Sequence, residues 1–195
     1  MTRRLFFLPA VFIFTAFSVP GALFAASVTV DAATLVPNVA VSFSPRTGSF
    51  EEGSTFQVPI VLDTNGTSIN GIEVRLNFDS DRLSIVQAST GQSIIGVWVE
   101  PPAYDNTRGT ASYVGVVPNG IVTDSGVIGT ITFRAKATGR AVVTVRSDSN
   151  ILLNDGLGSP ATFEKGRAEY AIITKAPGGV SVYSETHPSQ SSWYN

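Results

Sequence analysis

The feature of this sequence that most constrains its fold is a strict alternation of apolar and polar residues. Apolar residues occupy positions 72, 74, 76 and 78, and polar residues occupy positions 73, 75 and 77. A period of two describes a β-strand with one face in a hydrophobic core and the other in solvent. The polar residues Glu73, Arg75 and Asn77 are therefore predicted to point outward together.

Segments of similar character recur along the chain, separated by residues that favour turns. Asn65-Gly66, Asn119-Gly120 and Asn154-Asp155-Gly156 tolerate positive φ where the chain must reverse. Short strands between such turns are typical of an all-β sandwich rather than of βαβ units. Nine strands are expected, over residues 40–44, 55–63, 71–79, 83–88, 96–100, 110–117, 126–137, 141–146 and 168–174.

The apolar positions of these strands predict a single hydrophobic core. One strand contains Pro59, which cannot donate a ladder hydrogen bond, so that strand is expected to lie at a sheet edge or to switch sheets at a bulge. The predicted core comprises Phe56, Val58, Ile60, Leu62, Ile72, Val74, Leu76, Phe78, Leu83, Ile85, Val127, Ile131, Phe133, Val143 and Val145.

The composition divides the chain into four parts. Residues 1–26 resemble a secretory signal peptide, because a basic start and an apolar run precede the small residues Ala25 and Ala26. The pair Arg3-Arg4 also fits a twin-arginine signal, and an uncleaved membrane anchor is the alternative. Residues 27–38 are expected to form an extended lead-in, residues 39–175 the sandwich domain, and residues 176–195 a Pro/Gly/Ser linker or the start of a further module.

Charge and cysteine content exclude several kinds of function. Without Arg3 and Arg4, 11 of the 13 basic residues remain against 15 acidic ones, so the exported chain would carry a net charge of −4. A mildly acidic chain without a basic cluster is not expected to bind nucleic acid. Contact with a membrane is expected only through an uncleaved signal segment. The sequence has no cysteine, which excludes thiol catalysis, disulfides and cysteine metal sites.

Catalytic and metal chemistry are poorly supported by the sequence. The single histidine, His187, lies in the polar tail, so neither a Ser/His/Asp relay nor a histidine zinc site is expected in the domain. The acidic residues are read as solvated, and the oxygen-rich segments 79–81 and 148–155 as turns rather than calcium loops. We therefore expect no enzyme activity, no metal and no cofactor.

Aromatic residues in the middle of the chain offer a second way to bind a ligand. Exposed aromatic rings can stack on sugars, whereas buried ones fill a core. Trp98 alternates with Val97 and Val99, and alternation alone does not decide which side faces the core. Trp98 and Tyr104 are the candidate residues if the chain binds a polysaccharide directly.

Four segments, in order, resemble the cohesin domain, the receptor module of bacterial cellulosome scaffolds, and more loosely the cellulose-binding modules of the same fold. They are the run 53–62, the corner 77–83 with sequence NFDSDRL, the strand 126–137 with sequence GVIGTITFRAKA, and the segment 151–156 with sequence ILLNDG.

The resemblance implies a nine-strand jelly-roll sandwich that binds a dockerin module through one sheet face, in extracellular or cell-surface polysaccharide catabolism. Glu73 matches an acidic dockerin-facing position of the family. Gly71, and Val117 followed by Pro118, depart from polar positions of the family. A secreted binding module is therefore expected, with Glu73, Arg75 and Asn77 as partner-binding residues. Direct polysaccharide binding and cell-surface adhesion are the alternatives.

Overall fold

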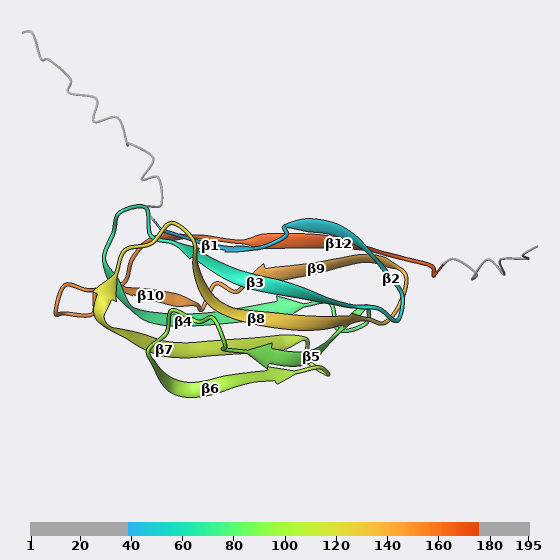
Figure 1. Ribbon diagram of the computed structural model, residues 1–195, viewed down its shortest axis with the longest axis horizontal. Coiled ribbons are helices and arrows are strands. Elements are labelled where there is room, and N and C mark those ends of the chain that lie inside the picture. The colour runs from blue at the N-terminus through green and yellow to red at the C-terminus, as the bar shows by residue number, and fades with distance from the viewer. Residues whose placement is uncertain (1–38, 176–195) are drawn as a thin grey trace, which may run out of the picture. The chain divides into compact units, whose positions relative to one another are not determined.

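Two β-sheets packed face to face form the described part of the protein (Figure 1). The computed structural model describes residues 39–175, and the signal segment, the lead-in, His187 and the linker predicted from the sequence lie outside them. The described residues contain no helix. The first sheet has the order β11-β1-β3-β8-β5, and the second has the order β2-β12-β9-β4-β7-β6 with β10 paired to β4.

The described residues form twelve strand segments. Those of the first sheet are β1 (Val39–Phe43), β3 (Thr55–Asp63), β5 (Leu83–Ser89), β8 (Gly126–Ala135) and β11 (Phe163–Lys165). Those of the second are β2 (Thr47–Glu51), β4 (Ile69–Phe78), β6 (Val97–Asp105), β7 (Thr110–Ile121), β9 (Gly139–Val145), β10 (Asn150–Leu153) and β12 (Arg167–Ile173).

The twelve segments reduce to the nine strands that the sequence predicts. Segments β1 and β2 are separated by a short turn, β9 and β10 both pair antiparallel with β4, and β11 and β12 are separated by one residue. Joining these three pairs leaves nine strands, and each expected strand overlaps one of them. The predicted all-β sandwich is confirmed.

Two neighbouring strands change sheets together and thereby close one side of the sandwich. Segment β11 runs parallel to β1 in the first sheet, and β12 runs parallel to β2 in the second. The chain passes from β11 to β12 at Gly166, where a Cβ atom would lie 2.4 Å from the carbonyl oxygen of Val41. Only glycine leaves room for the two strands to cross this closely.

The core agrees with the alternation in the sequence except at one position. Every predicted core residue is buried apart from Val127, and Ile128 is buried in its place. Strand β8 carries an extra residue here, because Ile60 pairs with Gly129 while Val61 pairs with Val127. A bulge shifts the alternation by one residue, so the prediction for Val127 was wrong.

The position of β3, the strand that contains Pro59, differs from the expectation that it lies at a sheet edge. Strand β3 lies inside its sheet, between β1 and β8, and does not change sheets; the bulge of β8 lies opposite the step from Ile60 to Val61. Pro59 sits beyond the last residue that β1 pairs with β3, and its carbonyl oxygen accepts a hydrogen bond from the Ser44 amide at 3.0 Å. The missing N–H therefore lies opposite Ser44, at the point where β1 ends, and only the reciprocal hydrogen bond of this last pair is lost.

The substitution Gly166→Ala tests the crossing of the two strands. The new methyl group meets the Val41 backbone, which cannot move without disturbing β1, so we expect the free energy of unfolding to fall by about 1–3 kcal/mol. Urea denaturation measures this change. Gly91→Ala is the matched control, because its Cβ would meet no atom closer than 3.6 Å. Equal stability of the two variants would contradict the tight crossing.

The hydroxyl groups of two buried tyrosines are expected to affect the free energy of unfolding differently. The Tyr170 hydroxyl donates a 2.8 Å hydrogen bond to the Pro45 carbonyl, whereas the Tyr113 hydroxyl has no partner among the described residues. Burial raises the pKa of both phenols. Tyr170→Phe should lower the free energy of unfolding by about 1 kcal/mol, and Tyr113→Phe should leave it unchanged or raise it. A comparable loss in both variants, measured by urea denaturation, would contradict the difference.

Candidate protein-binding face

The outer surface of the seven-stranded sheet carries the residues that the sequence selects. Glu73, Arg75 and Asn77 lie on β4, near the middle of this sheet, and their side chains point away from the core. The side chains of Glu73 and Arg75 are 29% and 37% exposed, and Asn77 is exposed. All three are therefore accessible to a partner from one side.

Strand register arranges this outer surface in rows that run across the strands. Directly opposed residues of antiparallel strands share a face, so each row is a line of neighbouring side chains. The rows are Leu152–Gly71–Val116–Val97, then Asn150–Glu73–Val114–Glu100, then Arg75–Ser112–Ala103, and then Arg167–Thr144–Asn77–Thr110–Asp105.

The two charged residues at the centre of this face are held in place by one another and by the segment after β9. Glu73 and Arg75 form an ion pair. Glu73 also accepts a 2.9 Å hydrogen bond from the Asn150 side chain, and Arg75 donates a 2.9 Å hydrogen bond to the Asp148 carbonyl. Because both side chains are already fixed by these contacts, little entropy would be lost if a partner bound to them.

Ser149 brings that segment against β4. On the side of β4 that faces away from β7, strands β9 and β10 leave a gap at Val74 and Arg75, and the Ser149 side chain fills it. Its hydroxyl accepts a hydrogen bond from the Arg75 amide at 3.0 Å and donates one to the Arg75 carbonyl at 3.1 Å. Ser149 is 4% exposed, and it continues the ladder of β4 with side-chain atoms.

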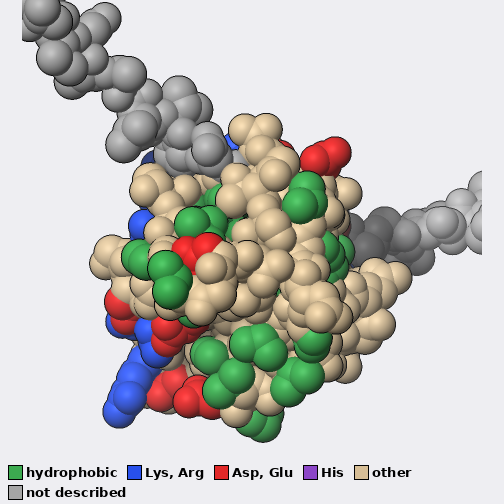
Figure 2. All heavy atoms as spheres, turned by 90° about the vertical axis from the view of Figure 1, so that its left-hand side faces the viewer, with side chains coloured by type: hydrophobic (Ala, Val, Ile, Leu, Met, Phe, Trp, Pro, Cys, Tyr) green, Lys and Arg blue, Asp and Glu red, His purple; other side chains and the backbone are tan. Residues whose placement is uncertain are grey.

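A shallow hollow of about 350 Å³ lies beside Arg75 on the same face. Its lining includes Arg75, Asp105, Ser112, Arg146 and Asp148. Arg146 donates two hydrogen bonds to Asp148, of 2.9 Å and 2.8 Å, and these lower the pKa of the Asp148 carboxyl. Acidic and basic side chains lie next to one another at the lower left of Figure 2, with hydrophobic side chains beside them. Two basic and two acidic side chains line the hollow, so its charges are matched.

Comparison with known proteins gives the family. The sequence model of the cohesin domain matches residues 39–160, which is more than half of the chain. The chain belongs to the cohesin family. No curated protein matches the sequence.

Solved structures with the same fold include three cohesin modules. The OlpC cohesin of Clostridium thermocellum, solved in complex with a dockerin, has a TM-score of 0.56 and 16% identity, over 73% of this chain and 99% of that one. The seventh ScaB type I cohesin of Pseudobacteroides cellulosolvens has a TM-score of 0.55 and 18% identity, over 71% and 94%. A cohesin module from a family 33 glycoside hydrolase of Clostridium perfringens has a TM-score of 0.56 and 12% identity, over 72% and 98%.

The two aromatic candidates for sugar binding do not share an exposed platform in this cohesin domain. Trp98 is half-buried against the core, with its ring centroid 6.2 Å from that of Tyr113, and Val97 and Val99 are the exposed residues beside it. Tyr104 is 44% exposed and borders the hollow. Trp98 lies opposite Gly115 and Tyr104 lies opposite Ala111, so the two residues share a face of β6 but lie at different steps along the strand.

In the oxygen-rich turn at Asp155, the carboxylate accepts its hydrogen bonds from backbone amides of the same turn. Asp155 accepts hydrogen bonds from the amides of Leu157 at 2.8 Å and Gly158 at 2.9 Å. In the described part of the chain, no cluster of three or more His, Cys, Asp or Glu residues could hold a metal ion. The same residues include no helix that is long and apolar enough to cross a membrane.

Several residues of this face could not be found from the sequence. Arg146, Asp148 and Ser149 lie between β9 and β10, and Asn150 is the first residue of β10. Their position over β4 depends on the pairing of β9 and β10 with the same neighbour, for which the sequence carries no local signal.

Asp155 makes the stability of the domain depend on pH. Hydrogen bonds from the Ser159 side chain and then from the Leu157 amide lower the pKa of its carboxyl to about 2. A lowered pKa in the folded state stabilises the protein above the unfolded pKa, near 4, and this contribution is lost as the pH falls to about 2. Asp155→Asn should therefore lower the Tm at pH 7, and the difference from wild type should shrink between pH 4 and pH 2.

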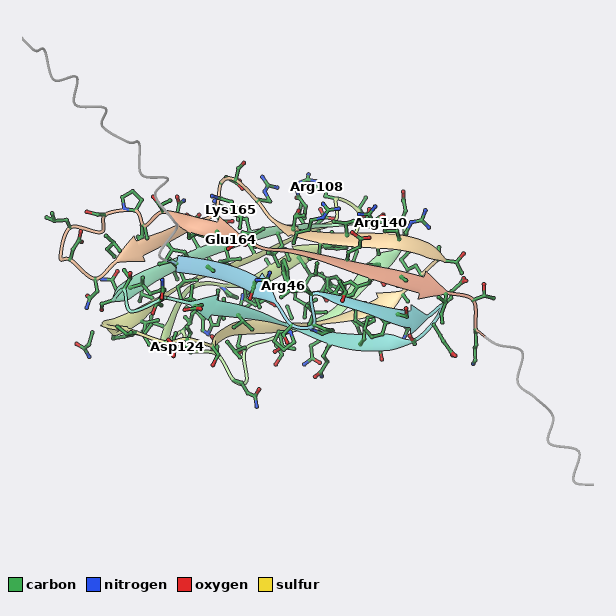
Figure 3. All side chains as sticks on the ribbon, turned by 90° about the horizontal axis from the view of Figure 1, so that it is seen from above. Arg46, Arg108, Asp124, Arg140, Glu164 and Lys165 are labelled. Atoms are coloured by element: carbon green, nitrogen blue, oxygen red, sulfur yellow. The ribbon has the colours of Figure 1, made fainter. Side chains whose placement is uncertain are left out.

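The control for this pH dependence is Asp124→Asn. Asp124 is exposed and projects from the opposite side of the molecule to Arg108 and Arg140 (Figure 3). For this variant, the difference in Tm from wild type should be the same at every pH, as measured by thermal unfolding followed by circular dichroism. If the difference in Tm between Asp155→Asn and wild type were also independent of pH, the Asp155 carboxylate would not be the source of the pH dependence.

Proposed function

We propose that this chain is a secreted, non-catalytic cohesin module that binds a dockerin-type protein module through the outer face of its seven-stranded sheet. The observation that carries this proposal is the pair Glu73 and Arg75, exposed at the centre of the face and already fixed by hydrogen bonds. The neighbours solved with dockerins support the kind of partner. The signal-like residues 1–26 support export to the cell surface or the medium, where the partner would act in polysaccharide degradation.

Charge arrangement on this face favours specificity over general adhesion. Surface ion pairs contribute little to folding stability, so the pairs of this face are available for recognition. Oppositely charged groups side by side favour binding of a partner with the complementary charge pattern and disfavour binding of a partner with like charges at the same positions. A mixed, flat and partly apolar surface is typical of interfaces with an apolar centre and a polar rim.

Calorimetry against a panel of dockerin modules tests the proposal. Glu73→Arg places a second cation beside Arg75 and removes the acceptor of Asn150, so we expect the affinity of any dockerin that binds wild type to fall at least tenfold. Glu164→Arg is the matched control, because Glu164 is exposed on β11 of the other sheet (Figure 3). Equal binding by wild type and Glu73→Arg would reject this face.

A further inference from the structure

The turn between β3 and β4 has flanking residues that its geometry does not require. Asn65 and Gly66 have φ angles of 43° and 79°, and the Thr67 amide donates a 2.8 Å hydrogen bond to the Thr64 carbonyl. Positive φ at both central residues defines a type I′ turn, for which Asn-Gly is a favoured pair. The turn type therefore accounts for Asn65 and Gly66 but sets no requirement at positions 63 and 67.

A second turn with the same pair of residues lacks these flanking groups. Asn119 and Gly120 have φ angles of 67° and 75°. The residue two positions before Asn119 is Val117 and the residue two positions after it is Ile121, and both are apolar. The Asn154 side chain covers this turn, because its amide donates a 3.0 Å hydrogen bond to the Asn119 carbonyl. The two turns share a backbone shape and differ in the side chains around it.

Asp63, Asn65 and Thr67 together match an acceptor sequence for N-glycosylation. An asparagine followed by Ser or Thr two positions later is the general acceptor motif. Bacterial N-oligosaccharyltransferases also select a carboxylate two positions before the asparagine, and Asp63 supplies one. Among residues 1–194, no other asparagine is followed by Ser or Thr at that distance. The chain therefore presents this pattern at a single turn.

The acceptor side chain is open to solvent in the folded protein. Thr64, at the base of the turn, is 0% exposed and forms three hydrogen bonds with Thr123, of 2.8, 2.9 and 3.0 Å. Asn65 and Gly66 at the tip are exposed, and a Cβ atom on Gly66 would meet nothing within 4 Å. The Asn65 backbone amide donates a 2.8 Å hydrogen bond to the Asp63 carboxylate, which leaves the Asn65 side-chain amide available.

We propose that Asn65 is a site of N-linked glycosylation in the exported chain, with a lipid-linked diphospho-oligosaccharide as the donor. In this transfer, Nδ2 of Asn65 forms a bond to C1 of the first sugar and loses one proton to solvent. The bond between C1 and the diphosphate oxygen breaks, and the lipid diphosphate leaves with the electron pair. The inference goes beyond the proposed function and shares with it only the export of the chain, because this transfer takes place outside the cytoplasmic membrane.

A glycan at this turn lies at one end of the sandwich and leaves the proposed binding face open. The connection from β3 to β4 is at the left-hand end in Figure 1, and Glu73 and Arg75 lie further along β4. Asp63 pairs with Ala40 at the start of β1, so the glycan is beside the point where the chain enters the domain. Exposed turns are preferred sites of proteolysis, and a bulky hydrophilic group protects them. We expect the glycan to slow proteolysis without changing the affinity for a dockerin.

The experiment measures the mass of the full chain isolated from its producing organism. The mass should exceed that of the polypeptide by one glycan, and peptide mass spectrometry should locate the glycan on Asn65. Asn119 in the same molecule is the matched internal control and should carry none. The same measurement is made on variants exported from a bacterium that contains an N-oligosaccharyltransferase and its lipid-linked donor, where Asn65→Gln should remain unmodified.

Three further variants separate recognition of the acceptor sequence from the shape of the turn. Asp63→Asn keeps an oxygen that can accept the Asn65 amide but removes the charge, and Thr67→Val keeps the size of the side chain but removes the hydroxyl. Both variants should lose the glycan, whereas Thr67→Ser should keep it. Circular dichroism melting curves check that all variants are folded. Glycosylation of Thr67→Val at the level of wild type would overturn the assignment of the acceptor sequence.

The outcomes separate this inference from the proposed function. An exported chain without a glycan on Asn65, isolated from its producing organism, overturns the inference and leaves dockerin binding unaffected. Retention of the chain inside the cell with its signal segment intact overturns both the inference and the proposed export. If the glycosylated wild type bound a dockerin more weakly than Asn65→Gln, the position of the glycan away from the binding face would be wrong.

Discussion

The requirement that every buried backbone group find a hydrogen-bond partner shapes this domain wherever its strands stop pairing. Three polar side chains take the place of a missing strand. Thr64 bonds to both the amide and the carbonyl of Thr123, at 2.9 and 3.0 Å, and Asn106 does the same for Ile85 on the edge strand β5, at 2.7 and 3.0 Å. Ser149 does so for Arg75. Each of these three side chains ties a connecting segment to the backbone of a segment next to it through two hydrogen bonds.

The order of the proposed binding face depends on Ser149, the third of these side chains. Because Ser149 continues the ladder of β4, the residues on either side of it must lie over the outer surface of the sheet. Asp148 then reaches Arg75 and Asn150 reaches Glu73, and the exposed charges are fixed from both ends of the gap. The Ser149 hydroxyl, which bonds the Arg75 backbone, therefore also orders the surface that we propose for recognition. The hollow beside Arg75 is lined in part by Arg146 and Asp148, from the segment between β9 and β10.

Local pattern was a reliable guide wherever the strands are regular. Period-two alternation located the core side of β4, because burial of one face is a property of each residue and its neighbours in sequence. The same pattern failed at Val127, since a bulge depends on which strand lies opposite. It could not decide the orientation of Trp98, because the bulges of β6 depend in the same way on the neighbouring strand β7. Pro59 signalled an irregularity correctly, but its position inside the sheet required knowledge of where β1 ends.

The sequence alone determined the class of fold and the outward direction of Glu73, Arg75 and Asn77, because both depend on the spacing of apolar residues along single strands. Only the tertiary structure decided which strands are neighbours, and with them the rows of the binding face and the support from Ser149. The contacts that β4 makes with β7, with β10 and with Ser149 join residues about 30 to 85 positions apart in the chain. Contacts at such separations depend on strand register across the whole sheet, which alternation within a strand does not encode.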